Sequence, residues 1–272
     1  MIARWLAYTR ARQWAHFLPL PLAGLARAHS LRDAAWRALA SIGACACVLA
    51  FGYLLNAVTD RQMDGDPRKN PLLRERARSF AGPLAALALS SLALASTISP
   101  LALAAAAAAL ASGWCYSAGP RWKSVPFAGT ALNVAAFAPL MFLGVRDGDD
   151  ARALAPLALA FAALLLQNQL LHEAADVEED RRGGLRTTFA VLGPRGSAAA
   201  AMLCGLALCA AASTDGASLA LALCAPLSLL APVALLRAEN PHAAASARRW
   251  HRLASMAAGA ALFARFAAGA RG

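Results

Sequence analysis

Two groups of polar residues in this sequence have the spacing that places side chains on one face of a helix. Asn56, Asp60 and Asp64 follow one another at intervals of four residues, and Asp176 and Asp180 repeat that interval later in the chain. Since an α-helix completes a turn in about 3.6 residues, each group forms a stripe. Oxygen atoms are the ligands that Mg²⁺ prefers, and Mg²⁺ leaves positions for water and phosphate oxygens. The spacing therefore indicates two places that could hold a metal-bound diphosphate.

An alternative is that these acids are solvated helix ends that neutralise neighbouring arginines. Two such stripes occur at corresponding ends of two apolar segments, and each continues into its segment with further polar groups. Polar residues at membrane depth are costly and usually functional. This repetition favours a site over two solvated helix ends.

The segments that carry the stripes are long and apolar. The chain has 272 residues, is 59% hydrophobic and has a mean hydropathy of +0.50, whereas a soluble domain is roughly 45–50% apolar. A helix needs about 20 apolar residues to cross a bilayer. We predict an all-α fold: one domain over residues 1–272, a polytopic membrane bundle of about nine transmembrane helices with a central cavity opening at the cytoplasmic side. The predicted spans lie near residues 15–31, 36–58, 81–97, 100–117, 125–145, 153–175, 197–213, 217–236 and 250–268.

The few charges in the chain are mostly basic. There are 26 Lys and Arg against 15 Asp and Glu, a net charge of +11. Most of the cations fall in alternate connections between the predicted spans, so the positive-inside rule places the N-terminus and both stripes on the cytoplasmic side. We expect an integral protein of the plasma or inner membrane with a cytoplasmic active site. No nucleic-acid reading element is recognisable, so we expect no nucleic-acid partner, and the oligomeric state is not predicted.

The order and spacing of the motifs resemble the UbiA superfamily of intramembrane prenyltransferases. The matching stretches are LLNAVTDRQMD, DPRKNPLL, YSAGPRWKS and HEAADVEEDRRGGLRTTFAVLG, and the resemblance covers nearly the whole chain. It implies nine membrane helices, with Asn56, Asp60 and Asp64 as a first metal-binding motif and Asp176 and Asp180 as a second. These residues would hold Mg²⁺ that bridges a prenyl diphosphate, and the four aspartates would be the catalytic residues.

Basic and polar groups are implied to grip the diphosphate. The candidates are Tyr116, Arg121, Lys123, Arg68, Lys69 and Arg12. The superfamily has a YxxxK spacing after its fourth helix, but here Lys123 is seven residues from Tyr116, so the cation that takes this role is left open. For the cations, the alternative is a topology signal with attraction to anionic lipid.

Ala57 departs from the superfamily pattern, because the first motif normally has an aspartate at that position. On a continuous helix, position 57 lies near the face that carries Asp64. Four aspartates remain, enough for two bridged ions. Because one carboxylate is missing, we expect the metal affinity or the type of reaction to differ from that of typical members.

The second stripe extends deeper into its segment. Asn168 and His172 precede Asp176 at the same spacing of four residues. We hypothesise that Asn168 and His172 orient an acceptor molecule and that His172 or Glu173 takes a proton from it. Hydrogen bonding between helices is the alternative role for these residues.

These observations predict a Mg²⁺-dependent prenyltransferase, an enzyme that transfers an alkyl or aryl group other than methyl. The expected partners are a prenyl diphosphate donor, a hydrophobic or aromatic acceptor and the lipid bilayer. An aromatic quinone precursor or a lipid is the expected acceptor class, but no residue specifies it. One alternative is a membrane terpene cyclase of the same superfamily, which Ala57 favours slightly. Another is an ion-coupled transporter, which would place its acids near the middle of the bilayer.

Overall fold

The computed structural model describes residues 2–25, 31–62, 70–73, 75–214, 229–237 and 241–269. Over these residues the chain forms helices and turns and no strand, which confirms the predicted all-α class. The chain divides into two compact units. Unit 1 comprises Met1–Arg121, Pro139–Asp149 and Phe266–Gly272, and unit 2 comprises Trp122–Ala138 and Asp150–Arg265.

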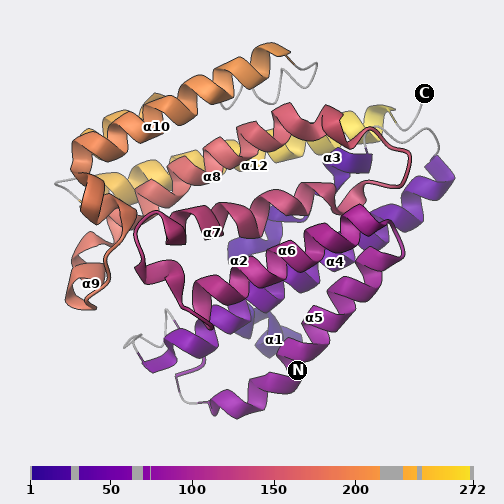
Figure 1. Cartoon of the computed structure of the whole chain (residues 1–272), viewed down its shortest axis with the longest axis horizontal. Helices are drawn as coiled ribbons and strands as arrows, with labels where there is room; N and C mark the ends of the chain where they lie inside the picture. Colours follow the sequence, from indigo (N-terminus) through magenta and orange to yellow (C-terminus); the bar gives the residue numbers. More distant parts are fainter. Residues whose placement is uncertain are drawn as a thin grey trace. The chain divides into compact units, whose positions relative to one another are not determined.

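Unit 1 is built around three long helices. In it, α4 (Leu31–Thr59) packs against α5 (Ala81–Ser96) and α6 (Pro100–Ser117), and α5 and α6 also pack against each other (Figure 1). The short helices α1 (Ile2–Tyr8), α2 (Ala11–Trp14) and α3 (Leu22–Leu25) precede them. The start of α6 is fixed locally, because the Ser99 side chain accepts a hydrogen bond from Ala102 N at 3.0 Å and Pro100 occupies the first turn. Both features are typical helix-start signals.

Unit 2 is centred on α8 (Ala155–Ala175), which packs against α7 (Ala128–Phe137) and α10 (Thr188–Thr214). The short helix α9 (Val177–Arg182) follows α8, and residues 229–236 and α12 (Pro241–Gly269) complete the unit. A shared apolar core joins α8, α10, residues 229–236 and α12 through Leu171, Phe189, Ala201, Leu235 and Ala244. Within α10, Gly193 has a φ of 64° directly before Pro194, so the helix is broken there at a residue that tolerates this conformation.

Among the described residues, five helical segments are long and apolar enough to cross a membrane: Ala35–Thr59, Ala77–Ser96, Pro100–Ser117, Ala151–Ala175 and Thr188–Ala211. A shorter apolar segment, Ala128–Gly144, matches the prediction at 125–145. The described part of the predicted span 15–31 is instead divided into a short 3-10 helix, turns around Pro19 and Pro21, and the short helix α3, because proline has no N–H to continue a helix. The predicted span 217–236 lies mostly outside the described residues, and the total of nine spans stays a prediction.

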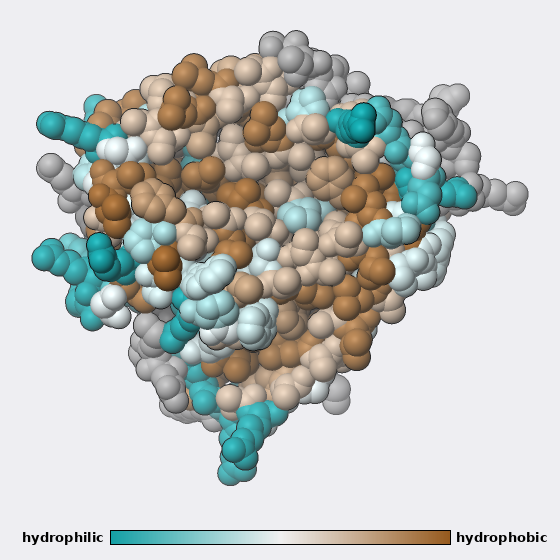
Figure 2. Space-filling model, viewed as in Figure 1, coloured by the Kyte–Doolittle hydropathy of each residue, from teal (hydrophilic) through white to brown (hydrophobic). Residues whose placement is uncertain are grey.

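Large apolar side chains lie on the outer surface of these helices. Leu39 is 70% exposed, Leu89 67% and Leu203 67%. Figure 2 shows hydrophobic side chains over much of the visible helical surface, with hydrophilic ones gathered toward its edges. An exposed apolar surface of this kind suits contact with lipid tails. The protein is therefore an integral membrane protein.

Candidate active site

The first motif lies where the membrane helix α4 ends. Asn56 is in the last turn of α4, and Asp60 opens a 3-10 turn, Asp60–Gln62, that follows Thr59. The Thr59 hydroxyl donates to the carbonyls of Leu55 and Asn56, at 3.0 and 3.1 Å. The continuous helical stripe expected through Asp60 is thus replaced by a tighter turn. Asp64, Arg68 and Lys69 lie outside the described residues.

Two residues from the end of α6 and its following loop contact the first motif. Arg121 Nη2 donates to Asp60 Oδ1 at 3.1 Å, and the side chains of Arg121 and Asp60 are 37% and 13% exposed. The Ser117 hydroxyl donates to Asn56 Oδ1 at 3.3 Å. The structure therefore brings Arg121, a predicted diphosphate-binding residue, to Asp60 of the first motif. Ser117 was not predicted, although its position next to Tyr116 in the YSAGPRWKS stretch is a signal that could have found it.

Ala57 lies in an apolar environment near the end of α4. It is fully buried in an apolar cluster with Tyr8, Leu54, Leu72 and Phe80. An aspartate at this position would place its carboxylate among these side chains, where an unpaired charge is strongly disfavoured. The alanine at position 57 is thus consistent with its packing.

Asn70 ties the chain after the first motif back to α4. It is fully buried, its Nδ2 donates to the Ala57 carbonyl at 2.8 Å, and its Oδ1 accepts from Leu72 N at 3.0 Å. Its amide thus satisfies two buried backbone groups. Sequence reasoning missed this residue, and the Asn-Pro turn signal in DPRKNPLL is the feature that could have indicated it.

A hollow of about 860 Å³ next to the first motif is rich in arginine. It is lined by Arg61, Leu73, Glu75, Arg76, Ala77, Arg78 and Ser79. Arg61 Nη1 donates to the Glu75 carbonyl at 2.6 Å, which fixes one of these cations against the loop before α5. Arg61, which follows Asp60 in the sequence, thus contributes to a basic surface.

The second motif lies at the junction of α8 and α9. Asp176 is the residue between the two helices, with φ −101° and ψ 7°, and Asp180 lies one turn further, in α9. Burial, followed by the negative charge of Asp176, raises the pKa of Asp180 to about 6. His172 Nδ1 lies 2.9 Å from Asp176 Oδ2. The end of α8 therefore gathers negative charge that a cation would stabilise.

Asn168 lies one turn before His172 on α8. Its Oδ1 atom is buried and has no hydrogen-bond partner among the described residues. A buried acceptor of this kind is normally satisfied. Asn168 Oδ1 is thus a buried acceptor with no partner among the described residues, and its contact with an acceptor molecule stays a prediction.

Glu173 is 6% exposed in the last turn of α8. Its Oε1 accepts from Thr130 Oγ1 at 3.0 Å and from Gln169 Nε2 at 3.1 Å, and its Oε2 accepts from Phe189 N at 2.8 Å. Its predicted contact with an acceptor stays a prediction.

The other predicted diphosphate ligands occupy separate elements. Tyr116 is half-buried in the last turn of α6, Arg12 is exposed in α2, and Lys123 lies in a 3-10 turn, Trp122–Ser124, that packs against α7. This packing is close: a Cβ atom on Gly129 would lie 3.0 Å from the Lys123 carbonyl oxygen. Gly129 thus allows α7 to approach the backbone of Lys123.

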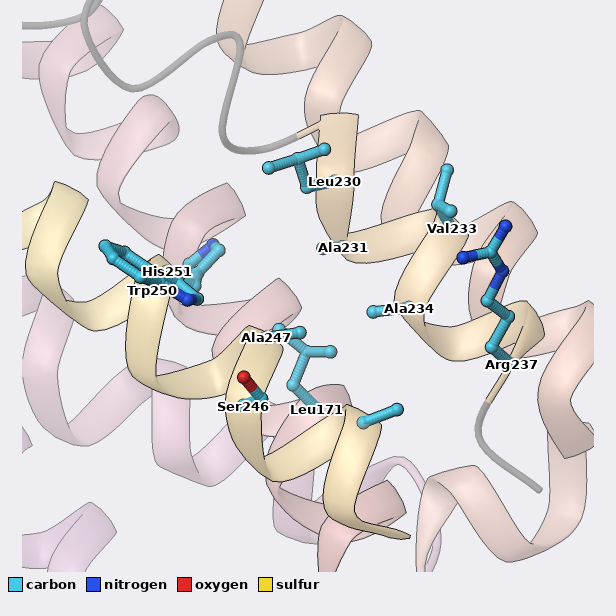
Figure 3. Close-up of a pocket in the computed structure, with 11 residues that line it drawn as sticks. Leu171, Leu230, Ala231, Val233, Ala234, Arg237, Ser246, Ala247, Trp250 and His251 are labelled. Carbon is cyan, nitrogen blue, oxygen red and sulfur yellow. The ribbon is translucent and has the colours of Figure 1, made fainter. Parts of the chain in front are cut away.

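The described part of the chain contains no cluster of three or more His, Cys, Asp and Glu side chains arranged to hold a metal ion. Asn56 and Asp60 belong to unit 1, whereas Asp176 and Asp180 belong to unit 2. A cavity of about 350 Å³ in unit 2 lies between residues 230–237 and α12, next to His251 and Trp250 (Figure 3), and no predicted site residue lines it.

Residues 17–256 match the UbiA prenyltransferase family, so the chain belongs to that family. This finding confirms the resemblance seen in the motifs and defines the class of protein as a prenyltransferase. No match was found among curated proteins.

Several solved structures share the fold. A UbiA homolog from Archaeoglobus fulgidus bound to GPP and Mg²⁺ has a TM-score of 0.71 and 20% identity, over 96% of this chain and 99% of that chain. A digeranylgeranylglyceryl phosphate synthase has a TM-score of 0.73 and 15% identity, over 99% of both chains. The apo structure of a UbiA homolog from Aeropyrum pernix K1 has a TM-score of 0.68 and 21% identity, over 92% of this chain and 96% of that chain.

Proposed function

We propose that this protein transfers a prenyl group from a prenyl diphosphate to an acceptor within the membrane, with Mg²⁺ as its cofactor. The observation that carries the proposal is the contact between Arg121 and Asp60, which joins a cation to a carboxylate of the first motif at the end of a membrane helix. Relatives of similar fold bind GPP or DMAPP together with Mg²⁺. We place this end of the helices and the N-terminus on the cytoplasmic side of the plasma or inner membrane, following the distribution of basic residues.

The residues of both motifs fit Mg²⁺. Asn56 and Asp60 supply an amide and a carboxylate oxygen, and we assign Asp64 to the same group. Asp176 and Asp180 supply two carboxylates; burial and then the negative charge of Asp176 raise the pKa of Asp180, and a bound cation would favour the charged form of both. When bound, Mg²⁺ would stabilise the charge that develops on the departing diphosphate.

The basic side chains would bind the diphosphate oxygens. Arg121 presents a planar fork of donors beside Asp60, which suits a phosphate group. The other proposed ligands are Tyr116, Lys123, Arg68, Lys69 and Arg12. In the reaction the bond between the allylic carbon and the diphosphate oxygen breaks, and the electron pair leaves with the diphosphate. The nucleophilic atom of the acceptor then forms the new bond to the allylic carbon and afterwards loses its proton.

Asn168 and His172 are the proposed contacts for the acceptor. Asn168 Oδ1 would accept a hydrogen bond from the acceptor. His172, held beside Asp176, would take the released proton. The apolar helices around the site exclude water from the allylic cation, so the acceptor is the nucleophile that reaches it. We propose an aromatic, quinone-precursor-like compound or a lipid as the acceptor class.

The purified protein should be incubated with Mg²⁺ and prenyl diphosphates of several chain lengths, with and without a panel of aromatic and lipid acceptors. Diphosphate release and a prenylated acceptor, detected by mass spectrometry, are expected only when Mg²⁺ is present. A hydrocarbon or alcohol product without acceptor would instead indicate the terpene cyclase alternative. If no allylic diphosphate were consumed under any condition, both activities would be excluded.

Variants of the aspartates provide the matched controls. Asp60→Ala and Asp176→Ala should abolish turnover while the protein retains its fold. Glu178→Ala removes an acid from α9 whose side chain is 71% exposed and lies 3.6 Å from Arg182. This control should retain activity, because Glu178 takes no part in the proposed metal site. Full activity in Asp60→Ala would contradict the metal assignment.

A further inference from the structure

The buried carboxylate of Glu173 connects three segments of unit 2. Thr130 belongs to α7, Gln169 lies one turn earlier on α8, and Phe189 provides a backbone N–H in the first turn of α10. The first N–H groups of a helix have no partner within the helix, and a negative charge at that end also interacts favourably with the helix dipole. Glu173 therefore fixes the start of α10 against the end of α8.

The hydrogen bonds continue from Thr130 toward Lys123. Thr130 Oγ1 lies 2.6 Å from Thr188 Oγ1, and Thr188 Oγ1 accepts from Phe127 N at 2.9 Å. Phe127 has a φ of 62°, a conformation that a non-glycine residue adopts only when its surroundings hold it there. It lies just before α7, four residues after Lys123. The chain of contacts thus runs from Glu173 to the loop that carries Lys123.

The second metal motif starts at the other end of this network. Asp176 is three residues after Glu173 and ends α8, so the position of its carboxylate depends on how that helix end is held. Any change in the contacts of Glu173 is therefore transmitted both to Asp176 and to the Lys123 loop.

We propose that Glu173 is a positioning residue. It fixes the second metal motif and the Lys123 loop relative to each other, so that both can contact the bound diphosphate. The proposal rests on the function proposed above. Three donors already occupy the two oxygens of Glu173, so it acts through these contacts and not by taking a proton from the acceptor. Its loss therefore weakens binding of the diphosphate donor, whether or not an acceptor is present.

The first test compares the wild type with Glu173→Gln. Glutamine has the same shape, but its amide nitrogen faces one of the three donors, so at least one hydrogen bond is lost. Hydrogen exchange measured by mass spectrometry should become faster over residues 122–130 and 176–189 in Glu173→Gln, with no ligand added. Unchanged exchange in both segments would overturn the proposal, and this result does not depend on whether the protein is a prenyltransferase.

The second test measures binding of an unreactive prenyl thiolodiphosphate in the presence of Mg²⁺ and without acceptor. The Kd of Glu173→Gln should rise roughly tenfold, about the loss expected for one charge-assisted hydrogen bond, while the KM for the acceptor is unchanged. Glu178→Gln, which removes the same charge from an exposed position, should bind like the wild type. Normal binding by Glu173→Gln with turnover lost would indicate proton transfer and overturn the proposal. If the wild type itself does not bind the analogue, the proposed function fails while the exchange result still stands.

Thr188→Val tests the path to Lys123. Valine keeps the shape of threonine but cannot accept from Phe127 N. If Glu173 acts through Thr188, the double variant should bind the analogue about as weakly as Glu173→Gln alone, because the two residues belong to one network. Fully additive losses would contradict the path.

Discussion

Arg121 donates a hydrogen bond to Asp60 at 3.1 Å, across 61 residues of sequence. This contact joins the loop after α6 to the end of α4 within unit 1. It brings together a carboxylate that we assign to the metal and a cation that we assign to the diphosphate. In the absence of substrate, the guanidinium of Arg121 also compensates the charge of the largely buried Asp60 carboxylate.

Arg121→Ala should therefore weaken binding of the prenyl diphosphate. We expect its KM to rise at least tenfold, because a guanidinium in a partly buried site makes charge-assisted hydrogen bonds that are about twice as strong as neutral ones. The measurement is steady-state kinetics with varied donor at saturating Mg²⁺. Arg121→Lys keeps the charge but loses the planar fork, so an intermediate KM is expected. Equal KM values in all three proteins would show that Arg121 serves Asp60 alone.

Restoring the superfamily aspartate should harm this protein. In Ala57→Asp the new carboxylate would be buried with Leu54, Leu72 and Phe80, so we expect a loss of about 3 kcal/mol or more in folding free energy. The lower stability is measured by thermal unfolding in detergent. Ala57→Ser is the control, because serine is polar but smaller than aspartate and uncharged. A stable Ala57→Asp protein with higher Mg²⁺ affinity would show instead that position 57 faces the metal.

Asn70 should stabilise the segment after the first motif. Asn70→Ala removes the donor to the buried Ala57 carbonyl and the acceptor for Leu72 N, and an unsatisfied buried group costs about 1–3 kcal/mol. A lower Tm is therefore expected. Asn70→Asp keeps an acceptor for Leu72 N but places a buried carboxylate oxygen against the Ala57 carbonyl oxygen, so its Tm should be no higher than that of Asn70→Ala. A Tm of Asn70→Ala equal to that of the wild type would mean that water replaces both contacts.

Acid should remove a contribution of Glu75 to stability. Glu75 accepts hydrogen bonds from Tyr8 and Arg4, and these lower the pKa of its carboxyl below the ordinary value. A group with a depressed pKa in the folded state stabilises the protein above its unfolded pKa, about 4.3 for Glu, and this stabilisation is lost as the pH falls through the folded pKa. The Tm of the wild type should exceed that of Glu75→Gln at pH 7, and the gap should close toward pH 3. If the difference in Tm between the two proteins did not change with pH, the charge of Glu75 would be excluded as its cause.

Hydropathy and spacing predicted the parts of the fold that depend on local sequence. Five predicted spans coincide with helices that are long and apolar enough to cross a bilayer, since length and composition alone determine that property. The breaks at Asp60 and Asp176 were not predicted, because a spacing of four residues also fits an uninterrupted helix. Where a helix stops depends on what its last turn contacts, such as the hydrogen bonds of Thr59 and Glu173.

The residues of the site that belong to recognisable motifs could be predicted from the sequence. Asp60 is predictable from the spacing of its motif, and Arg121 from the resemblance of YSAGPRWKS to the superfamily. Their contact across 61 residues is not predictable from either feature. The burial of Ala57 and the role of Asn70 were not predicted, because each depends on residues far along the chain. Phe80 and Leu72 cover Ala57 only when the loop folds back on α4. Long-range packing of this kind leaves no periodic signal in a single sequence.

Gly129 should be required for the position of Lys123. In Gly129→Ala the new methyl group would lie 3.0 Å from the Lys123 carbonyl oxygen and 3.1 Å from Lys123 Cα, so the backbone of the loop must shift by a few tenths of an ångström. Because a displaced cation loses its alignment with the diphosphate, we expect the KM for the donor to rise roughly tenfold, the scale of a small misplacement at a reacting site. Gly82→Ala adds the same group to α5, where nothing lies within 4 Å, and should leave the kinetics unchanged. A normal KM in Gly129→Ala, together with a loss of activity in Lys123→Ala, would show that the loop tolerates the shift and that Lys123 binds the diphosphate through a flexible side chain.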